Sequence, residues 1–580
     1  MNAPAPDLVI DAVRDDVAAL LGVDPGIIGD ADDLIGLGLD SIRMMRLAGG
    51  WRKHGYDVNF ADLAAAPTVA HWAAMLAPTA APAPETPVAF DESDWNQATF
   101  PLAPMQHAYW VGRTGAADLG GVAAHLYVEF DGEGLDPERL AAAAEALAHR
   151  HGMLRARFGS DGRQQVLPQL SRPALTVDDL RGSTVADVDH ALTVRRESKS
   201  HQVLDVAAGV VFDLTLTLLP GGRHRLHFDI DMLAADAMSY RTLLRDLVAL
   251  YDGQTLPPLT VEYRDYLKIR AQQPDPARDA DRDWWSQRLA DLPGAPVLPS
   301  RPAGQRTSDT PQVVRMNHWL TPDAREGLLS AARQHGVTPA AVVAAVYAAS
   351  VGAWSSSPTF LLNVPLFQRM PVHPEIDAVS GDFSSSILVD VDLRILTEPG
   401  RGSVLDLARD LGRRMHEAAS HSAYGALDVL RDLGRSRGET VLAPVVFTSA
   451  LGLGELFADD VYARLGRPAH LISQGPQVLL DAQVTEVDGG LLTNWDVRID
   501  QFPDGVVEAM FAHFSATLDR LALADSVAGW QTEALPQLPA DQRAIRCAVN
   551  DTGVPASGRV LHEGFFAVAD QDPNRTALLW

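Results

Sequence analysis

The sequence predicts a multidomain chain in which a small helical domain precedes a larger α/β domain. The chain has 580 residues, too many for one hydrophobic core, and 47% of them are hydrophobic and 21% charged, as is typical of globular domains. Residues 78–89, PTAAPAPETPVA, are rich in proline and alanine and lack a periodic hydrophobic pattern, which is typical of a semi-rigid spacer. We therefore expect a linker over residues 78–97.

Residues 1–77 contain three or four short helical patterns, and a small four-helix bundle is expected there. In the clearest pattern Thr68 provides a cap, and Val69, Trp72 and Leu76 follow at helical spacing.

Residues 98–535 show the mixed pattern of an α/β domain. Residues 225–230 alternate between polar and apolar, as a half-buried strand does, and a helical leucine pattern follows over residues 243–250. The length suits two lobes, about 98–275 and about 300–535. The longest uncharged stretch, 337–367, is interrupted by prolines, so its first half is interpreted as a buried helix and not as a membrane span.

Composition argues against several classes of partner. The formal charge of −27 repels nucleic acid and anionic lipid, so neither nucleic acid nor a membrane is an expected partner. The single cysteine, Cys547, can form neither an internal disulfide nor a cysteine cluster for a metal. The first residues lack the basic and apolar regions of a secretory signal. A reducing cytoplasm is therefore the expected location, and no metal is expected.

Ser41 is the candidate attachment point of a cofactor. In Leu37-Gly38-Leu39-Asp40-Ser41-Ile42, glycine permits a tight turn, and the Asp-Ser pair stands at the start of an amphipathic helix, whose free N–H groups favour an anion. The alternative is that Ser41 is only a helix cap. The stretch resembles the attachment motif of acyl, aryl and peptidyl carrier proteins, which implies 4'-phosphopantetheine on Ser41.

The carrier resemblance also implies partners. A phosphopantetheinyl transferase would attach the arm to Ser41. Because no loading domain precedes the carrier in this sequence, a stand-alone aryl-acid adenylating enzyme is expected to supply salicylate or 2,3-dihydroxybenzoate.

A second motif lies at Asp231-Met232-Leu233-Ala234-Ala235-Asp236-Ala237-Met238-Ser239. It resembles the D-x-x-x-x-D-x-x-S signature of the heterocyclization domains of non-ribosomal peptide synthetases. Met232 stands where ordinary condensation domains have their second histidine, so a histidine-dependent mechanism is excluded. The alternative interpretation makes Asp231 and Asp236 ordinary loop acids and Ser239 the cap of a helix beginning at Tyr240. A buried carboxylate needs a partner, so Asp236 in particular is expected to bind an arginine.

Further stretches resemble the other motifs of heterocyclization domains, in the family's order, over residues 100–496. They are Phe100-Pro101-Leu102 with Gln106, Tyr109 and Arg113; Arg150-His151; Leu292-Pro293; Thr338-Pro339; Gly381-Asp382-Phe383-Ser384; Pro444 to Leu451; Ser473-Gln474 with Asp481; and Trp495-Asp496. The sequence departs from the family at Ala103, Ser384, Ser386 and Gly475, where local contacts are expected to differ.

The resemblance implies a fold and a reaction. The fold is a small four-helix carrier bundle followed by a V-shaped α/β pseudo-dimer of lobes like chloramphenicol acetyltransferase. A carrier-bound cysteine, serine or threonine is condensed with the donor thioester, and cyclodehydration then closes a thiazoline or oxazoline ring. Carried over from the matching motifs, Asp481 is the proton shuttle, and Thr448 is expected to hydrogen-bond either Asp481 or the hydroxyl being expelled. Asp231, Asp236 and Asn363 are further site residues. For Thr448 and Asp481 the alternative is a strand-end threonine and a structural ion pair.

Residues 536–580 are expected to be a linker and the beginning of a truncated adenylation domain, because Asn550-Asp551-Thr552 and Leu561 to Phe566 resemble its entry. Downstream adenylation and peptidyl carrier domains are therefore expected partners, and the overall order resembles aryl-capped siderophore synthetases. Three rival functions are a domain that condenses without cyclizing, a non-catalytic docking platform and a stand-alone acetyltransferase. The last would need a histidine at Met232.

Overall fold

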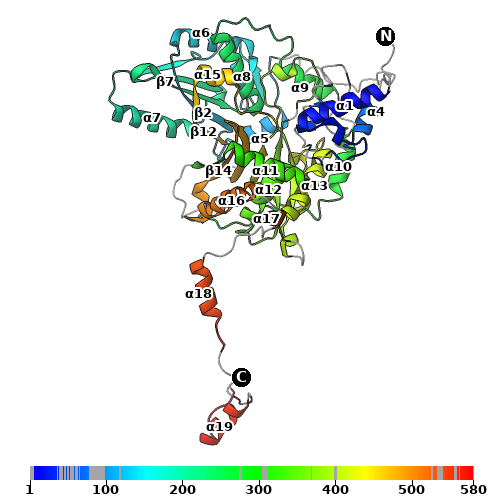
Figure 1. Cartoon of the computed structure of the whole chain (residues 1–580). Coiled ribbons are helices and arrows are strands. Elements are labelled where there is room, and N and C mark those ends of the chain that lie inside the picture. Colours follow the sequence, from blue (N-terminus) through cyan, green and yellow to red (C-terminus); the bar gives the residue numbers. More distant parts are fainter. Residues whose placement is uncertain are drawn as a thin grey trace. The chain divides into compact units, whose positions relative to one another are not determined.

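The computed structural model describes residues 6–34, scattered positions from 37 to 63, and residues 66–76, 98–115, 119–273, 277–302, 311–367, 369–397, 402–523, 527–531, 540–553, 558, 560 and 562–578. The chain divides into two compact units, Met1–Leu535 and Pro536–Trp580. Figure 1 follows the chain from the N-terminal helices to the C-terminal unit.

The N-terminal region is helical, with α1 (Pro6–Leu21) and α4 (Val69–Leu76) as its fully described helices. Its core includes Val17, Leu34 and Trp72, which are fully buried. The indole N–H of Trp72 donates to the carbonyl of Leu63 at 3.0 Å, so the buried ring has its polar atom satisfied. Ser41 lies outside the described residues, between Leu39, which is buried, and Arg43, which is helical.

The first lobe is built on a five-stranded sheet in the order β12-β2-β7-β6-β5. Helices α6 and α8 pack against each other and share one hydrophobic core with this sheet. Asp136 caps α6 and is followed by Pro137, which is why the helix begins there. The bounds are β2 (His125–Glu133), α6 (Pro137–Arg150), β5 (Thr176–Asp179), α7 (Val185–Ser200), β6 (Phe212–Leu218), β7 (Arg223–Asp231) and α8 (Ala237–Tyr251).

A small three-stranded sheet, β1-β4-β3, and helix α5 accompany the first lobe. Their bounds are β1 (Phe100–Pro101), α5 (Pro104–Gly112), β3 (Ala156–Phe158) and β4 (Arg163–Val166). Helices α9 (Tyr263–Gln272) and α10 (Arg278–Ser286) then lead to the second lobe.

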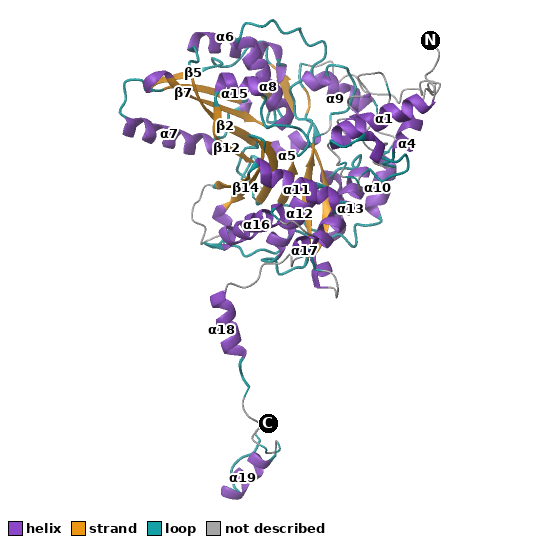
Figure 2. Ribbon diagram, viewed as in Figure 1, coloured by secondary structure: helices purple, strands orange, loops and turns teal. Residues whose placement is uncertain are grey.

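The second lobe is built on a six-stranded mixed sheet in the order β10-β9-β11-β13-β14-β8. Figure 2 shows helices lying against its strands. Every residue of α12 is buried, which confirms the buried helix expected in the uncharged stretch. The bounds are β8 (Val313–Leu320), α11 (Pro322–Gln334), α12 (Pro339–Gly352), β9 (Thr359–Leu366), β10 (Ser385–Asp392), α13 (Val404–Ser420), α14 (Ala426–Arg437), β11 (Val445–Ser449), β13 (Leu480–Val487), β14 (Gly490–Arg498), α16 (Val506–Ala522) and α17 (Val527–Trp530).

One segment of the second half of the chain belongs to the first lobe's sheet. Strand β12 (Arg467–Gln474) pairs antiparallel with β2, and α15 (Asp459–Leu465), just before it, packs on α8 and β2. The expected lobes are residues up to about 275 and residues from about 300. Strand β12 lies in the second of these ranges but belongs to the sheet of the first lobe. The crossing holds the two lobes together.

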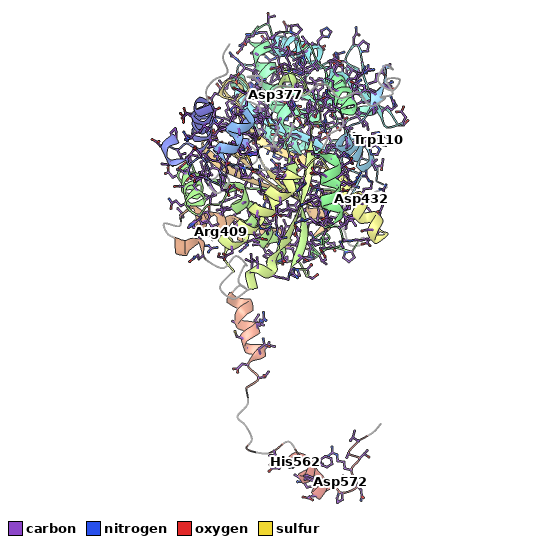
Figure 3. All side chains as sticks on the ribbon, turned by 90° about the vertical axis from the view of Figure 1, so that its right-hand side faces the viewer. Trp110, Asp377, Arg409, Asp432, His562 and Asp572 are labelled. Carbon is purple, nitrogen blue, oxygen red and sulfur yellow. The ribbon has the colours of Figure 1, made fainter. Side chains whose placement is uncertain are left out.

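The second unit contains α18 (Ala540–Asn550) and α19 (Glu563–Gln571). His562 and Asp572, labelled in Figure 3, flank α19.

In the part of the chain that the structure describes, no single helix is long and apolar enough to cross a membrane, although α11 and α12, bent by 100° at their junction, pass that test together by length and composition. Among these same residues, no group of three or more histidine, cysteine, aspartate or glutamate side chains is placed to hold a metal ion.

Candidate active site

A cavity of about 290 Å³ is lined by residues of both lobes. From the first lobe come residues of α5 and of the loop and helix after β7, including Met105, Tyr109, Met232 and Met238. From the second come residues of β9, β11, β13 and β14, including Asn363, Thr448, Asp481 and Asp496. Much of the rest of the lining is apolar, with Leu427, Leu430 and Leu442 among it. The cavity can therefore hold an apolar acyl group beside a few polar side chains.

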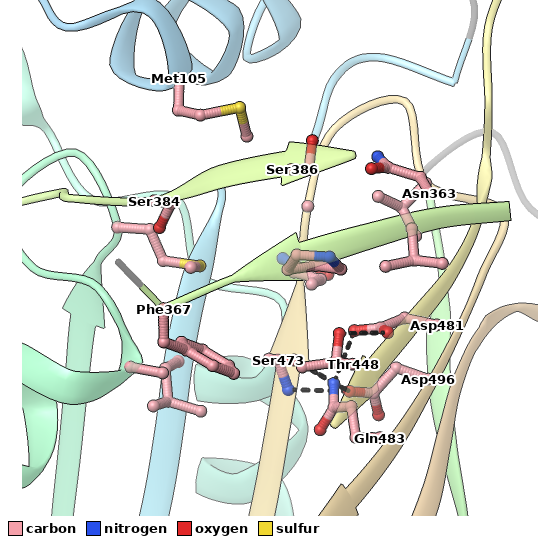
Figure 4. A pocket seen from close by; sticks show the side chains of 18 of the residues that line it. Met105, Asn363, Phe367, Ser384, Ser386, Thr448, Ser473, Asp481, Gln483 and Asp496 are labelled. Carbon is pink, nitrogen blue, oxygen red and sulfur yellow. Dashed lines mark hydrogen bonds between the residues drawn. The ribbon is translucent and has the colours of Figure 1, made fainter. Parts of the chain in front are cut away.

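Thr448 and Asp481 meet because β11 and β13 are parallel neighbours. Val446 pairs with Asp481 and Thr448 with Gln483 in this register, and alternate residues of each strand face the cavity. The Thr448 hydroxyl donates a hydrogen bond of 3.0 Å to Asp481 Oδ1. Figure 4 shows this pair at one side of the pocket, with Gln483 and Asp496 beside it.

A buried ion pair stands behind Asp481. Arg315 on β8 lies opposite Asp496 on β14, and Asp496 lies opposite Asp481 on β13, so three charged groups form a row across the sheet. Arg315 Nε donates to Asp496 at 2.6 Å, and the two side chains are 7% and 3% exposed. Two carboxylates directly opposite each other repel, and Arg315 offsets that repulsion.

Gln483 connects the ion pair to Asp481. Its amide nitrogen lies 2.8 Å from Asp481 Oδ2 and 2.9 Å from Asp496 Oδ2, while its carbonyl accepts from Arg315 at 2.9 Å. The Ser473 hydroxyl, which donates to Asp496, also lies 2.7 Å from the Gln483 nitrogen. Both oxygens of Asp481 are therefore held in fixed directions.

Burial raises the pKa of Asp481 to about 6. The hydrogen bond from Gln483 opposes that rise, the charge of Asp496 adds to it, and Thr448 and Arg315 oppose it. A carboxyl that titrates near neutrality can both accept and give a proton, which is what a proton shuttle requires.

Asn363 also lines the cavity. It lies on β9 next to Val446 of β11, and its side-chain oxygen is buried without a hydrogen-bond partner among the described residues. An unsatisfied buried acceptor is costly, so a donor from a bound substrate would stabilise it.

Asp231 and Asp236, in contrast, do not line the cavity. Asp231 is fully buried, pairs with Arg113 at the end of α5, and accepts from the N–H of Leu233 at 3.1 Å. Burial raises the pKa of Asp231, and the charge of Arg113 opposes the rise. Asp231 therefore anchors α5 to the end of β7.

Asp236 connects the two lobes. It caps α8 by accepting from the Ser239 N–H at 2.6 Å, it accepts from the Phe383 N–H at 3.2 Å, and it pairs with Arg369 at 3.3 Å. Arg369 is thus the arginine partner expected for Asp236. Helix α8 begins at Ala237, so the alternative that Ser239 caps a helix beginning at Tyr240 is wrong. The Ser239 hydroxyl instead donates to the Gly381 carbonyl at 2.8 Å.

Replacing Asp236 by alanine is expected to lower the free energy of unfolding by about 2–3 kcal/mol, because the change removes a helix cap and leaves the buried guanidinium of Arg369 without its carboxylate. Urea unfolding measures this. The matched control is Thr184→Ala, which removes the exposed cap of α7 and is expected to cost about 1 kcal/mol. Equal losses for the two variants would contradict the lobe-connecting role.

Sequence reasoning missed Gln483 and Arg315. Gln483 could have been found, because it stands two residues after Asp481 and a strand places such residues on one face. Arg315 is 166 positions before Asp481 in a strand with weak alternation, and only the pairing of β8 with β14 brings it to the site.

The chain belongs to the condensation-domain family, because residues 96–536 match the family model described as "Condensation domain". Residues 11–76 match the model described as "Phosphopantetheine attachment site". The chain thus combines a carrier domain, which holds 4'-phosphopantetheine, with a condensation domain. The domain limits expected from the sequence stay predictions.

Its relatives include the phenyloxazoline synthase MbtB of Mycolicibacterium paratuberculosis, 51% identical over 100% of this chain and 49% of that protein. The phenyloxazoline synthase MbtB of Mycobacterium tuberculosis is also 51% identical, over 98% of this chain and 40% of that one. The pyochelin synthetase PchE of Pseudomonas aeruginosa is 37% identical over 98% and 39%. The chain therefore spans about half the length of the relatives it matches, or less.

Solved structures of a cyclization domain and of a condensation domain are similar to this chain. The cyclization-docking bidomain of EpoB, a non-ribosomal peptide synthetase of Sorangium cellulosum, is 31% identical and superposes with a TM-score of 0.65 over 77% of this chain and 88% of that one. The first condensation domain of the CDA synthetase, 19% identical with a TM-score of 0.59, shares the fold. The predicted fold class and the resemblance to carrier and condensation domains of such synthetases are confirmed.

Proposed function

We propose that this chain condenses an aryl thioester with a carrier-bound cysteine, serine or threonine and closes a thiazoline or oxazoline ring in the cavity between its lobes. The observation that supports this most is the Thr448–Asp481 pair, in which a cavity-facing carboxyl has its pKa raised to about 6. The names of the relatives, phenyloxazoline synthase and pyochelin synthetase, are consistent with this reaction in siderophore biosynthesis.

Asp481 carries two protons in succession. The acceptor side chain attacks the amide carbon, and its proton passes to the Asp481 carboxylate and then to the former carbonyl oxygen. As the C=N bond forms, Asp481 takes the proton of the nitrogen and delivers it to the same oxygen, which leaves as water. Positioned acid–base catalysis of this kind contributes about 10² to 10⁴ in rate. Thr448 donates to Asp481 and holds it toward the reacting atoms.

Ser41 is the residue proposed to carry 4'-phosphopantetheine. A serine hydroxyl before a helix suits the group, because the helix N-terminus favours the negative charge of a phosphodiester. When attached, the arm holds the acyl group as a thioester, the electrophile of the condensation. The chain's part is to hold amine and thioester together in one cavity.

Carrier and condensation domains act with adenylation domains, other carriers and a phosphopantetheinyl transferase. The particular partners proposed are a stand-alone aryl-acid adenylating enzyme and the downstream adenylation and peptidyl carrier domains that the end of the chain resembles. A cytoplasmic location is part of the same proposal.

Intact mass spectrometry tests the proposed function. The chain is converted to its phosphopantetheine form with salicyl- or 2,3-dihydroxybenzoyl-coenzyme A and offered the pantetheine thioesters of cysteine, serine and threonine. The expected product is lighter than the condensed amide by one water molecule. Ser41→Ala, which cannot be loaded, is the control. Formation of the amide alone with every acceptor would identify a domain that condenses without cyclizing. If no acyl group were transferred to any acceptor, the non-catalytic docking platform would be favoured.

A further inference from the structure

We propose that Tyr109 is a further catalytic residue of this cavity, which donates a hydrogen bond to the oxygen at the reacting carbon, and that Asp382 and Ser384 position its hydroxyl. This inference rests on the proposed function. Attack on either the thioester or the amide places negative charge on the carbonyl oxygen. Thr448 and Asp481 stand at one side of the pocket, and neither can serve that oxygen while Asp481 is occupied with the proton of the attacking group. A donor on another wall would fill this role.

Tyr109 is placed to be that donor. It projects from α5 of the first lobe into the cavity. Burial raises the pKa of Tyr109 well above its usual range, and the negative charges of Asp382, Asp236 and Asp481 add to the rise. The hydroxyl therefore keeps its proton throughout the neutral range. Tyr109 and Asp481 line the same cavity.

Ser384 lines the same cavity as Tyr109, and its backbone N–H donates to Asp382 Oδ1 at 3.0 Å. Hydrogen bonding by Ser384 opposes the rise in the pKa of Tyr109 and also the rise in the pKa of Asp382. Figure 4 shows Ser384 and Met105 at one side of the pocket and the Thr448–Asp481 pair at the other. Ser384 and Tyr109 thus form a polar wall apart from the proton shuttle.

Asp382 is a buried carboxyl, and no cationic side chain pairs with it among the described residues. It is 2% exposed, its Oδ1 accepts from the Ser384 N–H at 3.0 Å, and its Oδ2 has no hydrogen-bond partner among the described residues. Burial raises the pKa of Asp382 to about 7, and the charge of Asp236 adds to the rise.

The groups that face Asp382 come from four elements. Asp236 at the start of α8 is paired with Arg369, which precedes the loop of Asp382, so that arginine is already engaged. Tyr263 of α9 donates to the backbone carbonyl of Asp382 and not to its carboxyl. Tyr109 of α5 is the remaining group. Hydrogen bonding by Ser384 is therefore what opposes the rise in the pKa of Asp382.

The protonation of Asp382 sets the direction of the donors. When Asp382 is neutral, the Ser384 hydroxyl is not drawn to a carboxylate, and Tyr109 can donate into the cavity. When Asp382 is ionised, the Ser384 hydroxyl donates to the Asp382 carboxylate. The Ser384 oxygen then accepts a hydrogen bond from the Tyr109 hydroxyl, which turns that hydroxyl away from the substrate. No proton leaves these three residues in the reaction, since Tyr109 only stabilises the oxygen that Asp481 protonates.

Single-turnover rates of amide and ring formation test the proposal, with the loaded chain and threonyl pantetheine as acceptor. Tyr109→Phe is expected to slow both steps about 10²-fold, as removal of an oxyanion donor does. Tyr266→Phe is the matched control, because it removes a buried hydroxyl of α9 that does not line the cavity, and it is expected to leave both rates unchanged.

Wild-type ring formation is expected to rise with pH as Asp481 ionises near 6 and to fall as Asp382 ionises near 7. Asp382→Asn carries an amide that can only stay uncharged. The ratio of the rate of ring formation near pH 8 to the rate near pH 6 is therefore expected to be about tenfold higher for Asp382→Asn than for wild type. Tyr109→Phe rates within twofold of wild type, or an alkaline decline that persists in Asp382→Asn, would overturn the proposal.

A second measurement does not depend on ring formation. A carboxyl whose pKa is higher in the folded protein stabilises the fold at low pH and loses that contribution as the pH rises to the folded pKa, from about 4 to 7. The melting temperature of Asp382→Asn relative to wild type should therefore rise across this window and then level. A melting-temperature difference that stays constant with pH would overturn the role of Asp382, even if the chain formed no ring. If the difference follows the expected trend but the wild-type chain forms no product, the result counts against the proposed function alone.

Discussion

Replacing Asp481 by asparagine is expected to slow ring closure by about 10² to 10⁴, with the condensed amide accumulating. Asparagine keeps the size of the side chain and can still contact Thr448, but it cannot accept and return a proton. Condensation needs less acid–base assistance, because a thioester is a better electrophile than an amide. Mass spectrometry of the acceptor pantetheine thioester over time separates the two products by one water molecule, because condensation transfers the acyl group from the chain to the acceptor amine.

The matched control is Asp459→Asn, which alters an exposed carboxylate in the first turn of α15 and is expected to leave ring closure unchanged. Thr448→Ala should slow ring closure less than Asp481→Asn, because it removes the group that orients the shuttle and keeps the shuttle itself. If Asp481→Asn cyclized at the wild-type rate, the proton shuttle would have to be sought elsewhere in the cavity.

Replacing Arg315 by methionine is expected to lower the free energy of unfolding by about 3–5 kcal/mol, because the carboxylate of Asp496, 3% exposed, would then be buried without its counter-ion. Arg315 also lowers the pKa of Asp481, so its loss raises that pKa above about 6 and moves the acid limb of ring closure to higher pH. Urea unfolding measures the first effect, and a pH profile of single-turnover ring closure measures the second.

Arg413→Met provides the control for this stability effect. Arg413 pairs with Asp410 and Glu417 on the surface of α13, is 55% exposed, and should contribute less than about 1 kcal/mol. If Arg315→Met lowered the free energy of unfolding no more than Arg413→Met does, the row of charges across β8, β14 and β13 would not stabilise the site.

Some of the residues on the active-site strands could be predicted from the sequence. Thr448 and Asp481 were expected to act together, and alternation along a strand could have added Gln483 to them, since it shares the face of Asp481. Asp231 and Asp236 were expected as site residues, yet they anchor α5 to β7 and the first lobe to the second through Arg113 and Arg369. A spacing of five residues cannot tell a carboxylate that faces a cavity from one that is buried beside an arginine.

The sequence by itself determined the features that depend on local pattern. These are the helical carrier region, the buried helix α12, and the order of motifs that marks the condensation domain. Caps, periodicity and turns act over a few residues, so they can be read along the chain.

Only the tertiary structure decided which distant segments meet. Strand β12 crosses to the first lobe's sheet, Arg315 reaches Asp496 across a strand pair, and Tyr109 and Ser384 line one cavity from opposite lobes. Such contacts depend on sheet order and register, which are set by how whole faces bury against each other and not by any short stretch of residues. The pKa values of Asp481 and Asp382 follow from that burial, so their chemistry is a property of the fold.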